Sequence, residues 1–292
     1  MFLLSPDNPQ FDPPSLNSEL RTPVPSIVDP LASPSFLPTP PAPKAGEDPV
    51  WSGWDVLLLA GFTLLTLFFS QLFIVLGARR FVYPNQSWQD VAQKSVVVLL
   101  SQLLTYGVIA LYMILLVEGK YRTRFWKAIR WNWPGFAGLS LLGIGALMLT
   151  FDYLGARFLP MPKTTPFEQF FNRPFDAYLV AAFAVSLGPL MEELFFRGFL
   201  YPVLARRMGA ALGIMITGFF FGLIHLPQYG YSWAAVLIVC LVGVVLTTVR
   251  AVTKSVASSF LAHVGYNGTL LLLTAWATDG FRHMEKAAVS LF

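Results

Sequence analysis

The chain has 292 residues, of which 55% are hydrophobic and 12% are charged, and its mean hydropathy is +0.59. These values exclude an ordinary soluble domain, which needs far less apolar sequence to form a core. The net charge of +4 does not indicate nucleic-acid binding, because the basic residues gather at the ends of apolar runs. Composition therefore predicts an all-α, multi-pass integral protein of the plasma membrane, with the lipid bilayer as a partner and no nucleic acid.

Composition divides the chain into four segments. Residues 1–50 hold 13 of the 22 prolines and show no apolar periodicity, which is typical of disordered, partly polyproline II sequence. We predict a disordered proline-rich tail there. Residues 51–175 and 176–278 are predicted to form an N-terminal and a second transmembrane region, and residues 279–292 a C-terminal tail.

Seven apolar runs reach or approach the ~20 residues that a helix needs to cross a hydrocarbon core of about 30 Å. They lie near residues 54–77, 95–117, 135–159, 177–204, 209–226, 233–252 and 256–278. Gly188 and Pro189 interrupt the long fourth run, which can therefore form two helical pieces. The prediction is a transmembrane bundle of seven or eight helices.

The segment between the second and third runs, EGKYRTRFWKAIRWNW, is strongly basic. The positive-inside rule predicts that this loop is cytoplasmic, and the proline-rich tail with it. Arg79 and Arg80 stand at the opposite end of the first run and weaken that topology. No internal repeat of the kind found in many transporters is detectable.

Two carboxylates and an arginine interrupt the apolar stretch MEELFFRGFL. Charged groups deep in a bilayer are costly and are usually paired or functional. On an α-helix Arg197 lies only about 40° around the axis from Glu193 but about 140° from Glu192. We therefore expect Glu193 and Arg197 to form an ion pair. Glu192 is left free for a partner on another helix or for a role as a base.

Two histidines lie within or at the end of other predicted spans. His225 ends GFFFGLIH, and His263 opens HVGYN, in which Asn267 shares its helix face. The helix before His225 carries small residues at helical spacing, which allow a neighbouring helix to approach closely. These are Gly209, Gly213, Gly218 and Gly222. Such packing can bring His225 within reach of Glu192.

A glutamate with two histidines suits two forms of peptide-bond hydrolysis. In one, the carboxylate activates water directly and the histidine and asparagine donors stabilise the oxyanion. In the other, the histidine and glutamate side chains bind zinc, which polarises the water. Spacing alone leaves both open, beside a purely structural polar cluster. Asp152, well inside the third run, is expected to pair with Arg157 or to lie at the membrane interface.

Three short motifs occur in order: EELFFR (Glu192, Glu193, Arg197), FGLIH (Phe221, His225) and HVGYN (His263, Asn267). They resemble the EExxxR, FxxxH and HxxxN signatures of the CPBP family. These are the CAAX proteases and bacteriocin-processing enzymes, also called Abi proteins and similar to Rce1. The resemblance covers roughly residues 175–275, and each motif alone is weak. It implies that residues 176–278 form a catalytic region.

Carried over position by position, the resemblance implies that Glu192 is the general base, with His225 beside it. Glu193 and Arg197 would support the helix. His263 and Asn267 would hold the oxyanion or, for His263 together with His225 and Glu192, a zinc ion. Phe221 is expected to pack beside His225. The implied activity is that of an intramembrane endopeptidase, in the family usually a metalloprotease, acting on a membrane-associated peptide or protein.

Two other classes of function compete with this interpretation. A proton-coupled transporter would use Glu192 and the histidines as a relay, and it would show coupled flux without cleavage. A non-catalytic scaffold or immunity protein of the same fold would bind a partner through the same helices. Replacing Glu192 with Gln separates an enzyme from a scaffold, since the enzyme would lose its function and the scaffold would keep it largely intact.

Overall fold

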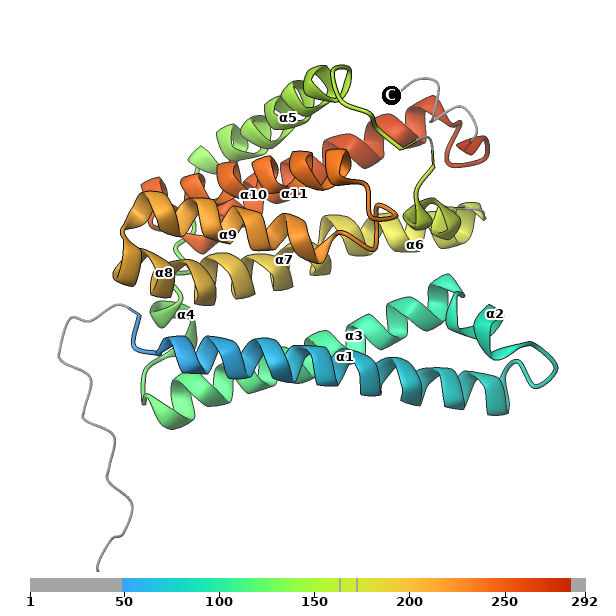
Figure 1. The fold of residues 1–292 in the computed structure, drawn as a ribbon, viewed down its shortest axis with the longest axis horizontal. Coiled ribbons are helices and arrows are strands. Elements are labelled where there is room, and N and C mark those ends of the chain that lie inside the picture. The colour runs from blue at the N-terminus through green and yellow to red at the C-terminus, as the bar shows by residue number, and fades with distance from the viewer. Residues whose placement is uncertain (1–48, 163, 172, 285–292) are drawn as a thin grey trace, which may run out of the picture. The chain divides into compact units, whose positions relative to one another are not determined.

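The computed structural model describes residues 49–162, 164–171 and 173–284, so the predicted tail at residues 1–50 lies almost wholly outside the described residues. Every regular element in the described ranges is helical and none is a strand, which confirms the all-α fold (Figure 1). The α-helices are α1 (Gly53–Phe81), α2 (Trp88–Ala92), α3 (Ser95–Ile114), α4 (Phe125–Ala128), α5 (Ala137–Ala156), α6 (Pro174–Val185), α7 (Leu187–Glu193), α8 (Tyr201–Met208), α9 (Ala210–Ile224), α10 (Trp233–Thr253) and α11 (Val256–Ala277). Shorter helices of other types are η1 (Leu115–Lys120), η2 (Pro166–Phe171) and η3 (Leu194–Leu200).

Six helical segments in the described residues are long and apolar enough to cross a membrane. They are Gly53–Phe81, Ser95–Lys120, Ala137–Ala156, Pro174–Met208, Trp233–Thr253 and Val256–Ala277. The run near 209–226, predicted as another span, forms α9, which has only 15 residues. At about 1.5 Å per residue α9 is roughly 22 Å long, short of a hydrocarbon core of about 30 Å. α9 alone is therefore too short to cross the apolar layer.

The fourth span is broken close to the predicted position. α6 ends at Val185, and Ser186, with φ −118° and ψ −83°, separates it from α7. Pro189 lies in the first turn of α7, where its missing N–H would have no helical partner. After Glu193 the chain widens into the π-helical segment η3 and then continues as α8. One interrupted span thus carries both glutamates beside an irregular turn, a feature frequent at functional sites.

The basic loop, the start of α1 and the end of α8 lie at the same end of the helices. Arg206 donates hydrogen bonds to the carbonyl oxygens of Pro49 and Trp51 at 2.6 and 3.0 Å. Lys120 of the basic loop pairs with Asp55 in the first turn of α1, with 2.7 Å between Nζ and Oδ1. This contact agrees with the predicted topology, which places the basic loop and the segment before α1 on the same side of the membrane.

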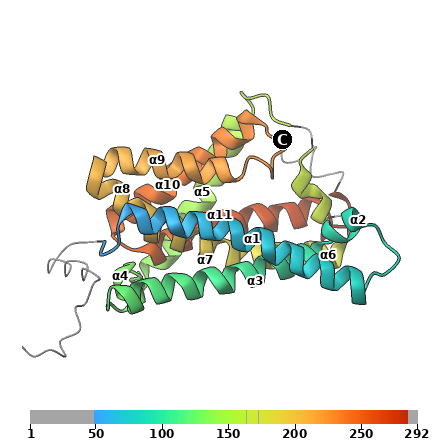
Figure 2. The ribbon, with the colours of Figure 1, turned by 60° about the horizontal axis from the view of Figure 1, so that its bottom comes forward.

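Close backbone packing joins α9 to α10, which lie side by side in both views (Figures 1 and 2). A Cβ atom on Gly218 would lie 2.7 Å from Val244 N, and one on Gly222 would lie 2.8 Å from Cys240 N. Only glycine allows this approach. Of the glycines expected to permit close packing before His225, Gly218 and Gly222 do so against α10, whereas Gly213 approaches Ala205 of α8 and nothing lies within 4 Å of a Cβ on Gly209.

Candidate active site

Three segments bring the predicted site residues together. The α7–η3 segment carries Glu192, Glu193 and Arg197, α9 ends at His225, and α11 carries His263. The carboxylate of Glu192 faces both rings. Its Oε1 lies 3.9 Å from His225 Nε2, and its Oε2 lies 3.7 Å from His263 Nε2.

The Glu193–Arg197 ion pair expected from helical spacing is present, with 2.8 Å between Glu193 Oε1 and Arg197 Nη1. Both side chains are completely buried. Arg197 also donates from Nε to Thr247 Oγ1 at 3.2 Å and from Nη2 to the Gly243 carbonyl oxygen at 3.0 Å. A buried guanidinium thus has partners on three sides, and it fastens the α7–η3 segment to α10.

Glu193 makes a second contact, which the sequence did not predict. Its Oε1 lies 3.0 Å from His263 Nδ1. Because a carboxylate only accepts hydrogen bonds, the proton of a neutral His263 ring lies on Nδ1. The unprotonated Nε2 atom of His263 then faces Glu192. Glu193 therefore sets both the tautomer and the direction of the ring that lies beside its neighbour.

His225 is held in the same way by the backbone of its own helix. Its Nδ1 lies 2.6 Å from the carbonyl oxygen of Phe221, so Nδ1 is the donor and Nε2 the acceptor in the neutral ring. Two imidazole acceptors thus flank a carboxylate at 3.7 and 3.9 Å. At these distances an imidazole nitrogen and a carboxylate oxygen can share a donor that lies between them. A water molecule can donate one O–H to the carboxylate and the other to an imidazole.

Exposure divides this cluster into a buried support and an accessible face. The side chain of Glu192 is 23% exposed and that of His225 is 15% exposed, whereas those of His263 and Glu193 are 4% and 0% exposed. Glu192 is therefore the carboxylate that water and a substrate can reach. Glu193 is sealed behind it.

Phe221 separates the two rings and covers the arginine. Its ring centroid lies 4.9 Å from that of His225, 5.7 Å from that of His263 and 4.4 Å from the guanidinium carbon of Arg197. The side chain is 2% exposed. A cation over an aromatic face is stabilised by the ring quadrupole, so Phe221 packs beside His225 and also supports the Arg197 anchor.

Asn267 lies one turn after His263 on α11. Its Nδ2 donates a hydrogen bond to the carbonyl oxygen of Ala184 on α6 at 2.8 Å. The bond ties α11 to α6 and leaves the second N–H of the amide free to point elsewhere. The role of Asn267 at an oxyanion stays a prediction.

Sequence reasoning missed several polar residues that complete the site. Thr247 and Gly243 hold Arg197. The sequence signal that could have identified Thr247 is its hydroxyl group in an otherwise apolar span, since such groups often form hydrogen bonds between helices. Tyr229, in the loop after α9, also faces the site. Burial and the nearby charges of Glu192 and Asp152 raise the pKa of Tyr229 to about 12, so its phenol stays protonated.

The expected pairing of Asp152 with Arg157 is not found. Arg157 Nη2 donates to the hydroxyl of Tyr153 at 2.8 Å, and its guanidinium lies 5.0 Å from the same ring centroid. Asp152 instead lies close enough to Tyr266 on α11 for the two groups to interact electrostatically. Helix geometry explains the error, because residues five apart lie about 140° from each other around the axis while residues four apart share a face.

The residues predicted as zinc ligands have suitable chemistry, two neutral imidazoles and a carboxylate. Their donor atoms stand 3.7 and 3.9 Å apart across Glu192, whereas ligand atoms around tetrahedral zinc lie roughly 3.3 Å apart for bonds of about 2.05 Å. Throughout the described part of the chain, no three or more histidine, cysteine, aspartate or glutamate side chains are grouped to hold a metal ion. The described arrangement is therefore wider than a zinc site requires.

Comparison with known proteins agrees with the motifs. A family model described as type II CAAX prenyl endopeptidase Rce1-like matches residues 174–269, about a third of the chain. The match contains every predicted site residue, from Glu192 to Asn267. No curated protein and no solved structure matches the chain. The match over residues 174–269 to the Rce1-like family model confirms the resemblance drawn from the three motifs.

Proposed function

We propose that this protein is an intramembrane endopeptidase in which Glu192 activates the attacking water. One observation carries the proposal: the acceptor nitrogens of His225 and His263 face the two oxygens of Glu192 at 3.9 and 3.7 Å. A water donating to the carboxylate and to one imidazole keeps an oxygen lone pair free for attack. Family membership supports peptide-bond hydrolysis as the reaction.

The proposed reaction begins with loss of a proton from this water to Glu192. The oxygen adds to the carbonyl carbon of the scissile peptide bond and forms a tetrahedral oxyanion. The free N–H of Asn267 and the protonated phenol of Tyr229 are candidate donors to that oxyanion. Glu192 then passes its proton to the leaving nitrogen as the C–N bond breaks, which returns the carboxylate to its starting state.

The neighbouring residues act by positioning. Glu193 fixes His263, Arg197 neutralises Glu193 in the apolar interior, and Thr247 and Gly243 hold Arg197. A site preorganised in this way avoids rearrangement of its dipoles during the reaction. Placing the supporting ion pair on the residue next to the base keeps the base itself free.

In the alternative form of the reaction, Glu192, His225 and His263 would hold a zinc ion. A bound zinc ion would lower the pKa of a coordinated water and polarise the scissile carbonyl. The donor spacing described above is wide for such an ion, and the proposed proton transfer needs only the residues of the chain.

The proposed substrate is a membrane-associated peptide or protein, with a prenylated C-terminal CAAX sequence as the first candidate. The name of the family supports that choice. Apolar helices around the site support a substrate that arrives from the bilayer rather than from bulk water.

The test is cleavage of a farnesylated CAAX peptide, and of the same peptide without its prenyl group, by the protein in lipid vesicles. We expect cleavage by the natural chain and a loss of at least about 100-fold in kcat for Glu192→Gln, because general bases contribute about 10²–10⁴-fold. Asp279→Asn, an exposed carboxylate outside the site, is the control. Equal activity in natural and Glu192→Gln protein would refute the role of Glu192. If the protein cleaves nothing but still binds a partner, a scaffold is favoured. If it takes up a solute into the vesicles together with protons, a transporter is favoured.

A further inference from the structure

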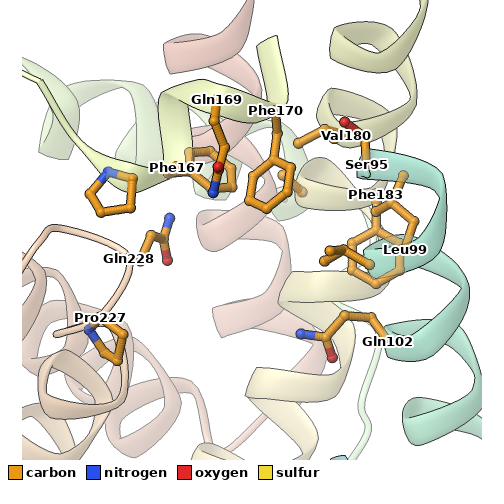
Figure 3. A pocket seen from close by; sticks show the side chains of 13 residues that line it. Ser95, Leu99, Gln102, Phe167, Gln169, Phe170, Val180, Phe183, Pro227 and Gln228 are labelled. Atoms are coloured by element: carbon orange, nitrogen blue, oxygen red, sulfur yellow. The ribbon is translucent and has the colours of Figure 1, made fainter. Parts of the chain in front are cut away.

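A cavity of about 360 Å³ lies between α3, η2, α6 and the loop that joins α9 to α10. This volume falls near the lower end of the range for ligand pockets, ~300–1,000 Å³. Three aromatic rings form part of its wall: Phe167 and Phe170 from η2 and Phe183 from α6 (Figure 3).

The polar part of the lining is made of amides. Gln102 comes from α3, Gln169 from η2 and Gln228 from the α9–α10 loop, and their amide groups lie around the open space from different sides (Figure 3). None of the thirteen lining residues is charged. None of the three amides forms a hydrogen bond with another described residue. Gln169 is exposed and Gln102 and Gln228 are half-buried, so their amides are accessible to a ligand and free to pair with its polar groups.

The cavity is connected to the site through its own lining residues. The carbonyl oxygen of Ala184, which lines the cavity, accepts the hydrogen bond from Asn267. Phe183 stacks on Tyr106 with ring centroids 5.4 Å apart, and Tyr106 lies within electrostatic range of Glu192. Gln228 follows His225 by three positions in the loop where the short helix α9 ends. The cavity therefore adjoins the site on the side of Asn267 and the loop that follows His225.

We propose that this cavity binds an uncharged segment of the substrate next to the scissile bond, in extended conformation. The inference rests on the proposed function. A glutamine amide offers the same donor and acceptor as a peptide group, so three of them match an extended backbone whose own hydrogen bonds are unsatisfied. The aromatic rings contact its side chains. A lysine or glutamate side chain is rejected, because the lining offers no charge to compensate its desolvation.

A hydrocarbon chain, such as a prenyl group, fits this cavity less well. It would cover the three amides without pairing with them, and an unsatisfied buried amide destabilises the complex. The cavity therefore selects for peptide, and any lipid group of the substrate must lie elsewhere.

Binding is tested on Glu192→Gln protein, so that cleavage does not interfere. The probes are fluorescent hexapeptides with a central uncharged residue, the same hexapeptides with central Lys or Glu, and farnesylcysteine methyl ester. Gln102→Leu, Gln169→Leu and Gln228→Leu are each added, with Gln89→Leu on the exposed helix α2 as the matched control. Melting temperatures identify any variant that fails to fold, and a photoreactive hexapeptide whose crosslinks are mapped by mass spectrometry reports the site without any glutamine substitution.

We expect each cavity variant to raise the Kd of the uncharged hexapeptide about fivefold, the effect of losing one net hydrogen bond. Gln89→Leu should leave Kd unchanged, and the crosslinks should fall on the lining residues. The proposal would be overturned if all variants had equal Kd, if the charged peptides bound equally well, or if no peptide bound at all. It would also be overturned if farnesylcysteine methyl ester bound instead in a way that depends on the glutamines. If the peptides bind as expected but the natural chain cleaves none of them, the proposed function fails and the cavity assignment stands. If the natural chain cleaves the peptides but replacing the three glutamines leaves KM unchanged, the cavity assignment fails and the proposed function stands.

Discussion

Glu193 Oε1 lies 3.0 Å from His263 Nδ1 and is shared with Arg197, so one buried carboxylate joins an ion pair to the ring that faces the candidate base. Two consecutive glutamates thus have different surroundings. Glu193 is enclosed by its partners, whereas Glu192 is partly exposed. Glu193 should therefore stabilise the fold, whereas Glu192 should act in catalysis.

Removing the anchor should destabilise the fold. Arg197→Ala leaves the buried Glu193 carboxylate without its cation, and breaking such a pair costs about 3–5 kcal/mol of unfolding free energy. Thermal and denaturant unfolding in detergent micelles measure the loss. Arg282→Ala is the control, because its side chain is 67% exposed and its pair with Asp279 contributes little. Glu192→Gln should unfold at nearly the same temperature as the natural chain. A loss as large as that of Arg197→Ala would show that the two glutamates do not divide their roles in this way.

Thr247→Val should destabilise the protein through a single hydroxyl. The substitution keeps the shape of the side chain but removes the acceptor of Arg197 Nε, and a buried donor without a partner costs about 1–3 kcal/mol. Thr248→Val is the matched control. Thr248 occupies the adjacent position of α10, and its exposed hydroxyl bonds only to the carbonyl oxygen of Val244. The melting temperatures of the two variants decide the matter, and equal shifts would contradict the proposed anchoring by Thr247.

Gly222→Ala should separate α9 from α10. The new methyl group would lie 2.8 Å from Cys240 N, and overpacking of this kind costs about 1–3 kcal/mol. Because His225 follows three residues later, kcat should fall together with stability. Gly61→Ala on α1 is the control, since nothing lies within 4 Å of the added methyl. Unchanged activity in Gly222→Ala would mean that His225 tolerates displacement of its helix.

Cleavage should resist chelation. The spacing of donor atoms around Glu192 is wider than zinc coordination, so we expect less than one zinc per chain by elemental mass spectrometry and little loss of rate with a chelator. His225→Ala and His263→Ala serve as comparisons. About one zinc per chain in the natural protein, lost in both variants together with activity, would instead make the two histidines ligands.

Local relationships on one helix could be predicted from the sequence. The Glu193–Arg197 pair follows from a spacing of four residues, and the break before Pro189 follows from the covalent geometry of proline. A spacing of five does not place two side chains on one face, and of the two alternatives given for Asp152, pairing with Arg157 is not found. The spans themselves followed from hydropathy, except that α9 ends at Ile224, because Pro227 closes the helix that the apolar run would have continued.

Contacts between distant segments could not be predicted. Glu193 and His263 are 70 positions apart, and their hydrogen bond depends on how α7 and α11 pack. The amide-lined cavity draws its three glutamines from three separate segments, none of which contains a motif. Single-sequence patterns report the face of one helix at a time, so they cannot identify its neighbours.

The shortness of α9 also has a consequence for the surrounding lipid. A helix roughly 22 Å long beside acyl chains that occupy about 30 Å creates a hydrophobic mismatch, which the bilayer relieves by thinning locally. Thinning brings the headgroup layer and its water down to the loop that starts at His225. Each Å of mismatch costs less than about 1 kcal/mol. Lipids with shorter acyl chains reduce the mismatch and should therefore favour hydration of the loop after α9. We therefore expect the acyl-chain length of the surrounding lipid to influence how readily water reaches Glu192.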